Sequence, residues 1–179
     1  GSLSLTGAIQ NSCNVYFYNV GRRLGVDRIA EAAEALGLGA EKTGIDLPGE
    51  KGGIIPSEAW SRNVRQSPWY PGETISVAIG QGPVLVTPAQ VAVHTSILAN
   101  RGRKPVPHLL GPGEPAVAPG SGSRGGRISA NVLETVVNGM WRCVNEGGTG
   151  KGAAVEGFDI CGKTGSTQTI GRETAERLG

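Results

Sequence analysis

Apolar positions at helical spacing divide the first part of the chain into three predicted helices. Residues 4–11 and 15–24 carry apolar side chains every three or four positions, which is typical of helices with one buried face. Asp27 is predicted to cap a third helix that ends at Gly37. Ser12-Cys13-Asn14 falls at the junction of the first two helices. We expect the three helices to pack together as one cluster.

Two later helices have stronger sequence signals. Thr87-Pro88-Ala89-Gln90 combines a capping hydroxyl, a proline at the first helical position and a glutamine that completes a capping box, and the helix is predicted to run to Asn100. Apolar residues in steps of one, three and four predict an amphipathic helix over 129–146. Its wide apolar face places Met140 and Trp141 in the core.

Alternating apolar and polar residues predict two strands. The first covers 75–79, and the second covers 155–167, where Phe158 and Ile160 alternate with polar neighbours. Glycine and proline break any period in 38–72, which we expect to be an extended loop with a turn of helix near 58–64. The Pro- and Gly-rich residues around 103–127 are expected to form a mobile surface loop.

Composition narrows the class of protein. A chain of 179 residues is the size of one domain, and 30 glycines imply many turns and close backbone contacts. Lys and Arg (17) barely outnumber Asp and Glu (15), and the basic face of a nucleic-acid binder is missing. The sequence has no run of 18 apolar residues and no signal peptide, so any membrane attachment is expected through an upstream anchor.

The cysteines and histidines do not form a metal-binding pattern. Cys13, Cys143 and Cys161 lack Cys-x-x-Cys or Cys/His ligand spacing, so we expect buried free thiols, with a Cys143–Cys161 disulfide left open. His94 and His108 have no acidic or cysteine partners at useful spacing and are expected to be structural or exposed. Neither a cofactor nor a metal is therefore expected.

The segment with the clearest chemistry is Lys163-Thr164-Gly165-Ser166. It places a cation and two hydroxyls on one stretch, and Gly165 lacks the Cβ that would keep a ligand from the backbone. Thr164 and Ser166 can donate to a carboxylate, and the Ser166 N–H is a candidate oxyanion-hole donor. The pattern indicates a site for a small anionic substrate.

A Ser-x-Asn triplet is a weaker signal, because it occurs three times, at 12–14, 61–63 and 129–131. Ser129 and Asn131 are expected to cap the helix that they open, and Ser61 lies in an irregular segment without an evident partner. Ser12 and Asn14 differ from the other pairs in their context.

That context resembles a known family. Ser12-Cys13-Asn14-Val15-Tyr16-Phe17-Tyr18 resembles the second motif of the class B penicillin-binding proteins, and Cys161-Gly162-Lys163-Thr164-Gly165-Ser166 resembles their third. Four segments between the two motifs are also similar to that family, in the same order and at similar spacing: Asp46-Leu47-Pro48-Gly49-Glu50, Trp69-Tyr70-Pro71-Gly72-Glu73, Ile79-Gly80-Gln81-Gly82 and Thr87-Pro88-Ala89-Gln90.

The resemblance implies an α+β fold of the β-lactamase/transpeptidase type, present only in part. Residues 1–179 would form a partial transpeptidase domain, mainly the helical subdomain plus the Lys-Thr-Gly strand. The rest of the antiparallel sheet would be missing, and the apolar face of Phe158 and Ile160 would be partly uncovered.

The resemblance also implies a peptidoglycan D,D-transpeptidase, which forms an acyl-enzyme with a D-alanyl-D-alanine stem peptide and is a target of β-lactams. Ser12 would relay a proton to the leaving amine, and Asn14 would orient the substrate amide. Lys163 would support Ser12 and attract the terminal carboxylate, which Thr164 and Ser166 would bind.

The nucleophile of this family is the serine of a Ser-x-x-Lys motif, and no Ser-x-x-Lys occurs in this chain. We therefore expect a fragment that is inactive alone, from a parent on the extracytoplasmic, periplasmic face of the bacterial inner membrane. Other cell-wall or divisome proteins are its expected partners.

Two alternatives remain open. A serine β-lactamase or β-lactam sensor would need a residue that activates water for deacylation; Glu50 is the nearest candidate by position, and Glu134 lies on the surface of a predicted helix. A non-catalytic cell-wall scaffold of the same fold is the second alternative. The absence of a suited glutamate favours transfer over hydrolysis.

Overall fold

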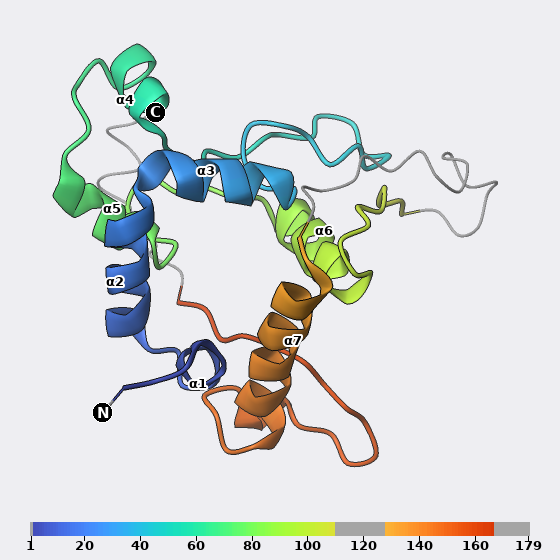
Figure 1. The fold of residues 1–179 in the computed structure, drawn as a ribbon. Helices are drawn as coiled ribbons and strands as arrows, with labels where there is room; N and C mark the ends of the chain where they lie inside the picture. The colour runs from blue at the N-terminus through green and yellow to red at the C-terminus, as the bar shows by residue number, and fades with distance from the viewer. Residues whose placement is uncertain (1, 110–127, 167–179) are drawn as a thin grey trace, which may run out of the picture.

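The computed structural model describes residues 2–109 and 128–166, and this part of the chain is largely helical (Figure 1). The predicted 103–127 loop lies mostly outside the described residues. The helices follow in the order α1 (Leu5–Gln10), α2 (Asn14–Leu24), α3 (Val26–Ala35), α4 (Glu58–Asn63), α5 (Pro71–Val77), α6 (Pro88–Ala99), α7 (Ala130–Asn145) and the 3-10 helix η1 (Lys151–Ala153).

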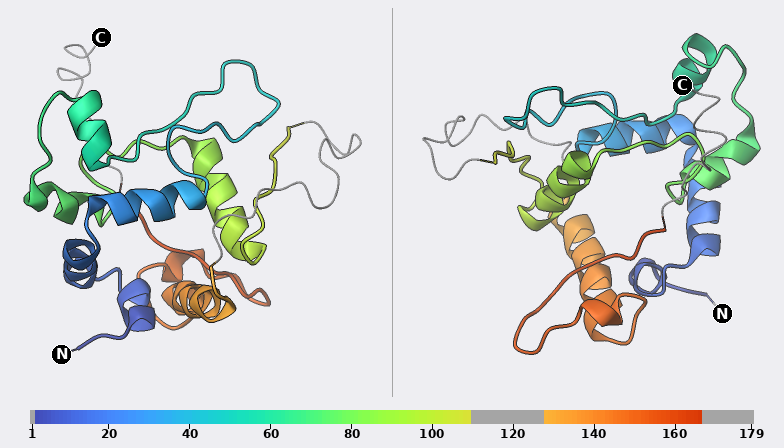
Figure 2. Two further views of the ribbon diagram at one scale, coloured as in Figure 1. Left: turned by 45° about the horizontal axis from the view of Figure 1, so that its top comes forward. Right: turned by 180° about the vertical axis from the view of Figure 1, so that it is seen from behind.

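The helices surround the segment that carries the Lys-Thr-Gly motif. In Figure 1 and in the rear view of Figure 2, α2, α3, α6 and α7 follow one another around the molecule, and α1 packs between α2 and α7. The chain after η1 crosses from α7 toward α2 and α5 in both views. Residues near the two ends of the chain are thereby brought together.

Local capping explains where several helices begin. The side chains of Ser4, Ser57, Thr87 and Ser129 each accept a hydrogen bond from a backbone N–H in the first turn of the helix that follows. The predicted capping box of α6 is confirmed, since Gln90 Oε1 also accepts from the Thr87 N–H at 3.1 Å.

The predicted cap of the third helix was wrong. Gly25, with a positive φ of 79°, stands at the N-cap of α3, and Asp27 lies in the first turn. The Asp27 carboxylate instead accepts a hydrogen bond from the Glu58 N–H at 2.8 Å. Asp27 therefore serves the start of α4, a helix 31 residues further along the chain.

The predicted strand over 75–79 was also wrong, because most of it belongs to α5. Pro71 occupies the first helical position, where it leaves no backbone N–H without a partner. The Glu73 carboxylate accepts from the Tyr70 N–H at 2.9 Å, so the start of the helix is capped. Alternation over only five residues is too short to exclude a helix, and the buried residues of α5, Thr74 and Val77, are three positions apart as in a helix.

The expected Lys-Thr-Gly strand is not formed in the described residues. Residues 159–166 have no regular secondary structure, and the part before them holds one isolated bridge, Val155 with Phe158. A strand needs a neighbour for its ladder of hydrogen bonds, and no strand lies beside this segment in the described part of the chain. Phe158 is 70% exposed, which agrees with the prediction that its apolar face would be partly uncovered.

The core includes a close contact between α1 and α7. Ala8 and Ile9 of α1 are buried against α7, whose buried residues include Leu133, Cys143 and Val144. Met140 and Trp141, predicted to be core residues, are only half-buried. Their face of α7 instead holds the residues that lead into the Lys-Thr-Gly motif.

Candidate active site

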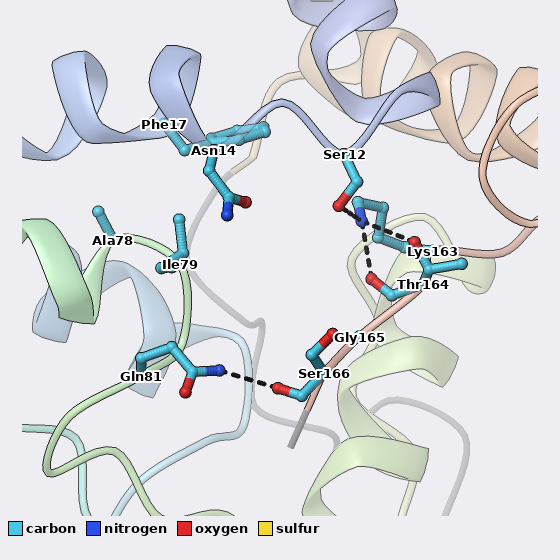
Figure 3. A pocket seen from close by; sticks show the side chains of 10 residues that line it. All are labelled: Ser12, Asn14, Phe17, Ala78, Ile79, Gln81, Lys163, Thr164, Gly165 and Ser166. Carbon is cyan, nitrogen blue, oxygen red and sulfur yellow. Dashed lines mark hydrogen bonds between the residues drawn. The ribbon is translucent and has the colours of Figure 1, made fainter. Parts of the chain in front are cut away.

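Three segments from different parts of the chain line one pocket of about 330 Å³ (Figure 3). The first is the α1–α2 junction, the second is the end of α5 with the turn after it, and the third is the Lys-Thr-Gly segment. All six candidate site residues lie at this pocket. Its lining consists of Ser12, Asn14, Phe17, Ala78, Ile79, Gln81, Lys163, Thr164, Gly165 and Ser166.

Ser12 is presented by a tight turn between two helices. Its φ of 50° lies in the left-handed region, which non-glycine residues seldom occupy. The N–H groups of Ser12 and Cys13 donate back to the carbonyl oxygens of Ile9 and Ala8, at 3.2 and 2.9 Å. These bonds close the turn after α1, and α2 begins at Asn14; the side chains of Ser12 and Asn14 both line the pocket.

Helix α7 holds the segment that precedes Lys163. The Trp141 indole N–H donates to Asp159 Oδ1 at 2.9 Å, and the Asn145 side chain donates to the Ile160 carbonyl at 2.9 Å. The Gly162 N–H donates to the Met140 carbonyl at 3.2 Å. The position of Lys163 is therefore set by the same helix that packs against α1.

The ammonium of Lys163 lies among three oxygen atoms. It donates to Ser12 Oγ at 2.7 Å, to the Thr164 carbonyl at 2.7 Å and to Thr164 Oγ1 at 3.3 Å. Although Lys163 is an exposed residue overall, desolvation of the ammonium lowers its pKa from the ordinary lysine value, and nearby Cys143 opposes this shift. The site thus joins a serine hydroxyl to a cation of reduced pKa.

The wall opposite Ser12 comes from the end of α5 and the turn that follows. The Gln81 side chain donates to the Ser166 carbonyl at 2.8 Å and bridges this wall to the Lys-Thr-Gly segment (Figure 3). Gly21 lets α2 approach the end of α5, since a Cβ there would lie 2.4 Å from the Ala78 Cβ. Gln81 lies in the family-like segment Ile79-Gly80-Gln81-Gly82, but nothing in its sequence context predicted this contact.

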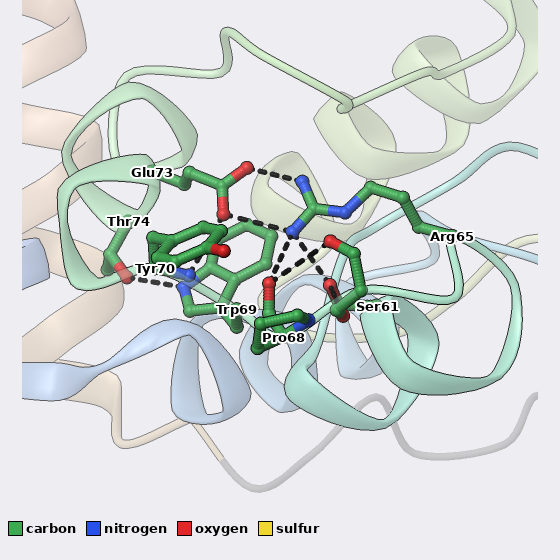
Figure 4. A network of polar contacts seen from close by, with 8 residues as sticks. Ser61, Arg65, Pro68, Trp69, Tyr70, Glu73 and Thr74 are labelled. Atoms are coloured by element: carbon green, nitrogen blue, oxygen red, sulfur yellow. Dashed lines mark hydrogen bonds and ion pairs between the residues drawn. The ribbon is translucent and has the colours of Figure 1, made fainter.

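A polar network holds α5 from outside the pocket (Figure 4). The Arg65 guanidinium forms an ion pair with the Glu73 carboxylate and lies 5.9 and 5.4 Å from the ring centroids of Trp60 and Trp69. The hydrogen bond and charge of Arg65 hold the pKa of Glu73 below its ordinary value, against the effect of burial. Ser61 is buried and donates to the Ser67 carbonyl, so it has partners that the sequence did not predict.

Other candidate residues lie apart from the pocket. The Glu50 carboxylate accepts hydrogen bonds from the Thr43 hydroxyl and from the Thr43 and Gly44 N–H groups; these outweigh the effect of burial and lower its pKa. His94 contacts the Leu36 carbonyl at 3.2 Å. Glu134 is an exposed residue of α7.

The three cysteines are free and differ in environment: Cys143 is buried, Cys13 is half-buried and Cys161 is exposed. Burial alone would raise the pKa of the Cys143 thiol, but hydrogen bonds with Thr149, Thr164 and Gly150 and the charge of Lys163 hold it below its ordinary value. Within residues 2–109 and 128–166, no three histidine, cysteine or acidic side chains gather as metal ligands would. None of the described helices combines the length and apolar character needed to span a bilayer.

The fold and this pocket define a class of protein. The chain belongs to the penicillin-binding protein transpeptidase domain family, whose model matches residues 1–178. It is 36% identical over 179 residues to the peptidoglycan D,D-transpeptidase MrdA of Acinetobacter baumannii, a match that covers 94% of this chain and 25% of the relative. The chain thus spans about a quarter of the length of that relative.

Solved structures agree with this assignment. The fold matches that of Pseudomonas aeruginosa PBP2 in complex with WCK 5153 with a TM-score of 0.81 and 36% identity, covering 91% of this chain and 38% of the other. It also matches a complex between the penicillin-binding protein PBP2 and MreC from Helicobacter pylori, with a TM-score of 0.79 and 29% identity, covering 94% of this chain and 31% of the other.

Proposed function

We propose that this chain is part of a peptidoglycan D,D-transpeptidase that cross-links stem peptides ending in D-alanyl-D-alanine and that β-lactams acylate. The observation that carries the proposal is the contact of 2.7 Å between Lys163 Nζ and Ser12 Oγ at the pocket. These side chains come from motifs 151 residues apart in the sequence, and the family match covers both.

In this proposal the two residues form a proton path for acyl transfer. The hydroxyl of a serine in a Ser-x-x-Lys segment attacks the peptide carbonyl and gives its proton to the lysine of that segment; a new C–O bond forms, and the C–N bond to the terminal D-alanine breaks. Ser12 donates a proton to the departing amine, and Lys163 replaces that proton through their hydrogen bond. The reduced pKa of Lys163 makes this transfer easier than for an ordinary lysine.

Substrate recognition is assigned to the Lys-Thr-Gly segment and Asn14. The ammonium of Lys163 and the hydroxyls of Thr164 and Ser166 bind the terminal carboxylate, while Gly165 lets the peptide approach the backbone. The amide of Asn14 points into the pocket in Figure 3 and orients the amide of the substrate.

The same proposal extends to the fold, location and partners of the complete protein. In the complete domain, residues 159–166 would pair with neighbouring strands of an antiparallel sheet, which would also cover Phe158. The complete protein would work on the extracytoplasmic face of the membrane beside other cell-wall proteins. The Helicobacter pylori relative, solved as a complex with MreC, supports a cell-shape protein of that kind as a partner.

A fluorescent penicillin tests the proposed activity. The full-length protein encoded by the gene of this chain is expected to give a covalently labelled band after denaturing electrophoresis, and the isolated 179-residue chain is expected to give none. A gene that encodes no Ser-x-x-Lys, or a full-length protein that is never labelled, would overturn the transpeptidase assignment and favour a scaffold.

Hydrolysis is less well supported than transfer. Glu50, the nearest glutamate to the second motif by position, already accepts three hydrogen bonds from its own loop and does not line the pocket. A penicilloyl-enzyme that persists for minutes or longer would agree with a transpeptidase. Release within seconds would instead indicate a β-lactamase.

A further inference from the structure

A chain of hydrogen bonds leads from the core of α7 to the pocket. The buried Cys143 thiol lies 3.5 Å from Thr149 Oγ1, and Thr149 Oγ1 lies 2.8 Å from Thr164 Oγ1. Lys163 then donates to both Thr164 and Ser12. Thr149 is therefore the link between the interior of the protein and the hydroxyl that we assign to carboxylate binding.

The loop that carries Thr149 is fixed at both sides. The Thr149 N–H donates to the Gln10 carbonyl at 3.2 Å, and the Gln10 side chain donates to the Glu146 carbonyl at 2.8 Å. The Gly150 N–H donates to the Cys143 carbonyl at 2.9 Å. Thr149 thus contacts the end of α1, two residues before Ser12, with its backbone and Thr164 with its side chain.

Gly148 shows how closely this loop sits on its neighbours. A Cβ at Gly148 would lie 2.6 Å from the Cys143 Cα and 2.7 Å from the Gln10 carbonyl oxygen, so only glycine fits there. A hydroxyl on such a constrained loop has a defined position, whereas a hydroxyl on a mobile loop does not.

The Thr164 hydroxyl is the point where this chain of hydrogen bonds meets Lys163. An ammonium donates only, so Thr164 Oγ1 must accept from Lys163. Thr149 Oγ1 lies 2.8 Å from the same oxygen atom, in a hydrogen bond in which either hydroxyl can be the donor. The Thr164 hydroxyl is therefore held from two sides, by Lys163 and by Thr149, at the edge of the pocket.

We propose that Thr149 is a positioning residue for recognition of the substrate carboxylate: its hydrogen bond with Thr164 holds the Thr164 hydroxyl beside the Lys163 ammonium, where both meet the ligand. This inference rests on the transpeptidase function proposed above. It adds a residue outside the two motifs to the site, and it assigns that residue an effect on carboxylate binding rather than on proton transfer.

The test compares two probes on the full-length protein. One is a fluorescent penicillin with its free carboxylate, and the other is the methyl ester of that carboxylate. With the free acid, Thr149→Val is expected to lower the second-order acylation rate constant by about five- to tenfold, the effect of one lost hydrogen bond. The ester cannot accept hydrogen bonds as a carboxylate does. With this probe, the acylation rate constants of Thr149→Val and of the unsubstituted protein should agree within about twofold.

Matched variants separate positioning from packing. Thr149→Ser retains the hydroxyl and should restore acylation by the free acid to within about twofold of the unsubstituted protein. Thr149→Ala removes the hydroxyl without adding bulk and should repeat the valine result if valine does not fit. Thr135→Val removes a hydroxyl that bonds the Asn131 carbonyl on α7, away from the pocket, and should change neither rate.

The outcomes are distinct. Unchanged acylation by the free acid in Thr149→Val and Thr149→Ala would overturn the inference while leaving the transpeptidase assignment intact. An equal loss with acid and ester would also overturn it, because Thr149 would then serve packing alone. An unsubstituted full-length protein that neither probe labels would overturn the proposed function itself, and this inference with it.

Discussion

Gly139 of α7 lies directly against Ile9 of α1, and a Cβ on Gly139 would come within 2.8 Å of the Ile9 Cβ. This contact sets how closely α1 approaches α7, the helix that holds the segment before Lys163. Because Ser12 follows α1 by two residues, the same contact controls the distance between the two motifs of the pocket.

Gly139→Ala is expected to destabilise the protein. Overpacking a tight contact costs about 1–3 kcal/mol, and the better helix propensity of alanine returns about 1 kcal/mol of this. Thermal unfolding should show a lower midpoint. Gly7→Ala on the facing helix is the control, since its added Cβ would meet only ordinary contacts of 3.5 Å. A drop in the unfolding midpoint of Gly7→Ala as large as that of Gly139→Ala would contradict the packing argument.

The alkaline limit of acylation should report Lys163. As pH rises above its lowered pKa, the ammonium loses the charge that attracts the substrate carboxylate, so the rate should fall at a lower pH than an ordinary lysine would give. Lys163→Arg should slow acylation at every pH, because a guanidinium does not give up a proton to Ser12, but it should move this limit upward, because arginine stays charged. Rates of labelling by fluorescent penicillin between pH 6 and 11 measure it.

Removing the amine of Lys163 should slow acylation strongly. Lys163→Met is expected to slow acylation of the full-length protein by about 100-fold or more, the size of a lost proton-transfer partner. Lys151→Met, at an exposed lysine of η1 outside the pocket lining, should leave the rate unchanged. Similar rates in the two variants would rule out the role assigned to Lys163.

The Arg65–Glu73 pair should stabilise the protein except in acid. Arg65 lowers the pKa of Glu73 in the folded state. The contribution of the pair to the free energy of unfolding is therefore fully present above the unfolded pKa of Glu73, about 4.3, and is lost as pH falls through the lower folded pKa. Glu73→Gln should therefore lower the unfolding midpoint at pH 7, and the difference should vanish in strong acid. A difference independent of pH would contradict this account.

Glu58→Gln is the matched control for that experiment. Glu58 forms an exposed ion pair with Arg62, four residues along α4. Such pairs contribute about 0.3–0.5 kcal/mol, so the change in midpoint should be small at every pH.

The bridge from Gln81 to Ser166 should matter for the pocket more than for stability. Gln81→Leu removes the donor to the Ser166 carbonyl and is expected to lower the acylation rate by about three- to tenfold, the value of one hydrogen bond. Gln66→Leu removes a comparable side chain that bonds only the nearby Asn63 carbonyl, and it should have no effect. Equal rates for Gln81→Leu and the unsubstituted protein would show that this bridge is dispensable.

The parts of the fold that the sequence predicted well depend on neighbouring residues. The capping box at Thr87 and Gln90 and the start of α7 at Ser129 are decided within one turn of helix. Asp27 was misassigned because its partner, the Glu58 N–H, comes from a distant segment. The strand predicted over 155–167 is not formed in the described residues because pairing depends on a neighbouring strand, which alternation does not reveal.

The residues of the site also divide into those predicted from local motifs and those that depend on distant contacts. Ser12, Asn14 and Lys163 were found through short motifs of recognisable chemistry. Gln81 and Thr149 were missed because their side chains matter through contacts 85 and 15 residues away, and a single glutamine or threonine carries no local signal. Such residues are identified only when the chain is folded.

The separation of 151 residues between Ser12 and Lys163 has a consequence for the order of folding. Bringing such distant residues together costs more loop-closure entropy than forming a helix or a capping box, so local elements form first. During synthesis, α1 and α2 leave the ribosome long before α7 and Lys163 exist. The pocket therefore cannot bind a ligand until this late segment has docked, and a nascent chain that carries only Ser12 and Asn14 has no assembled site.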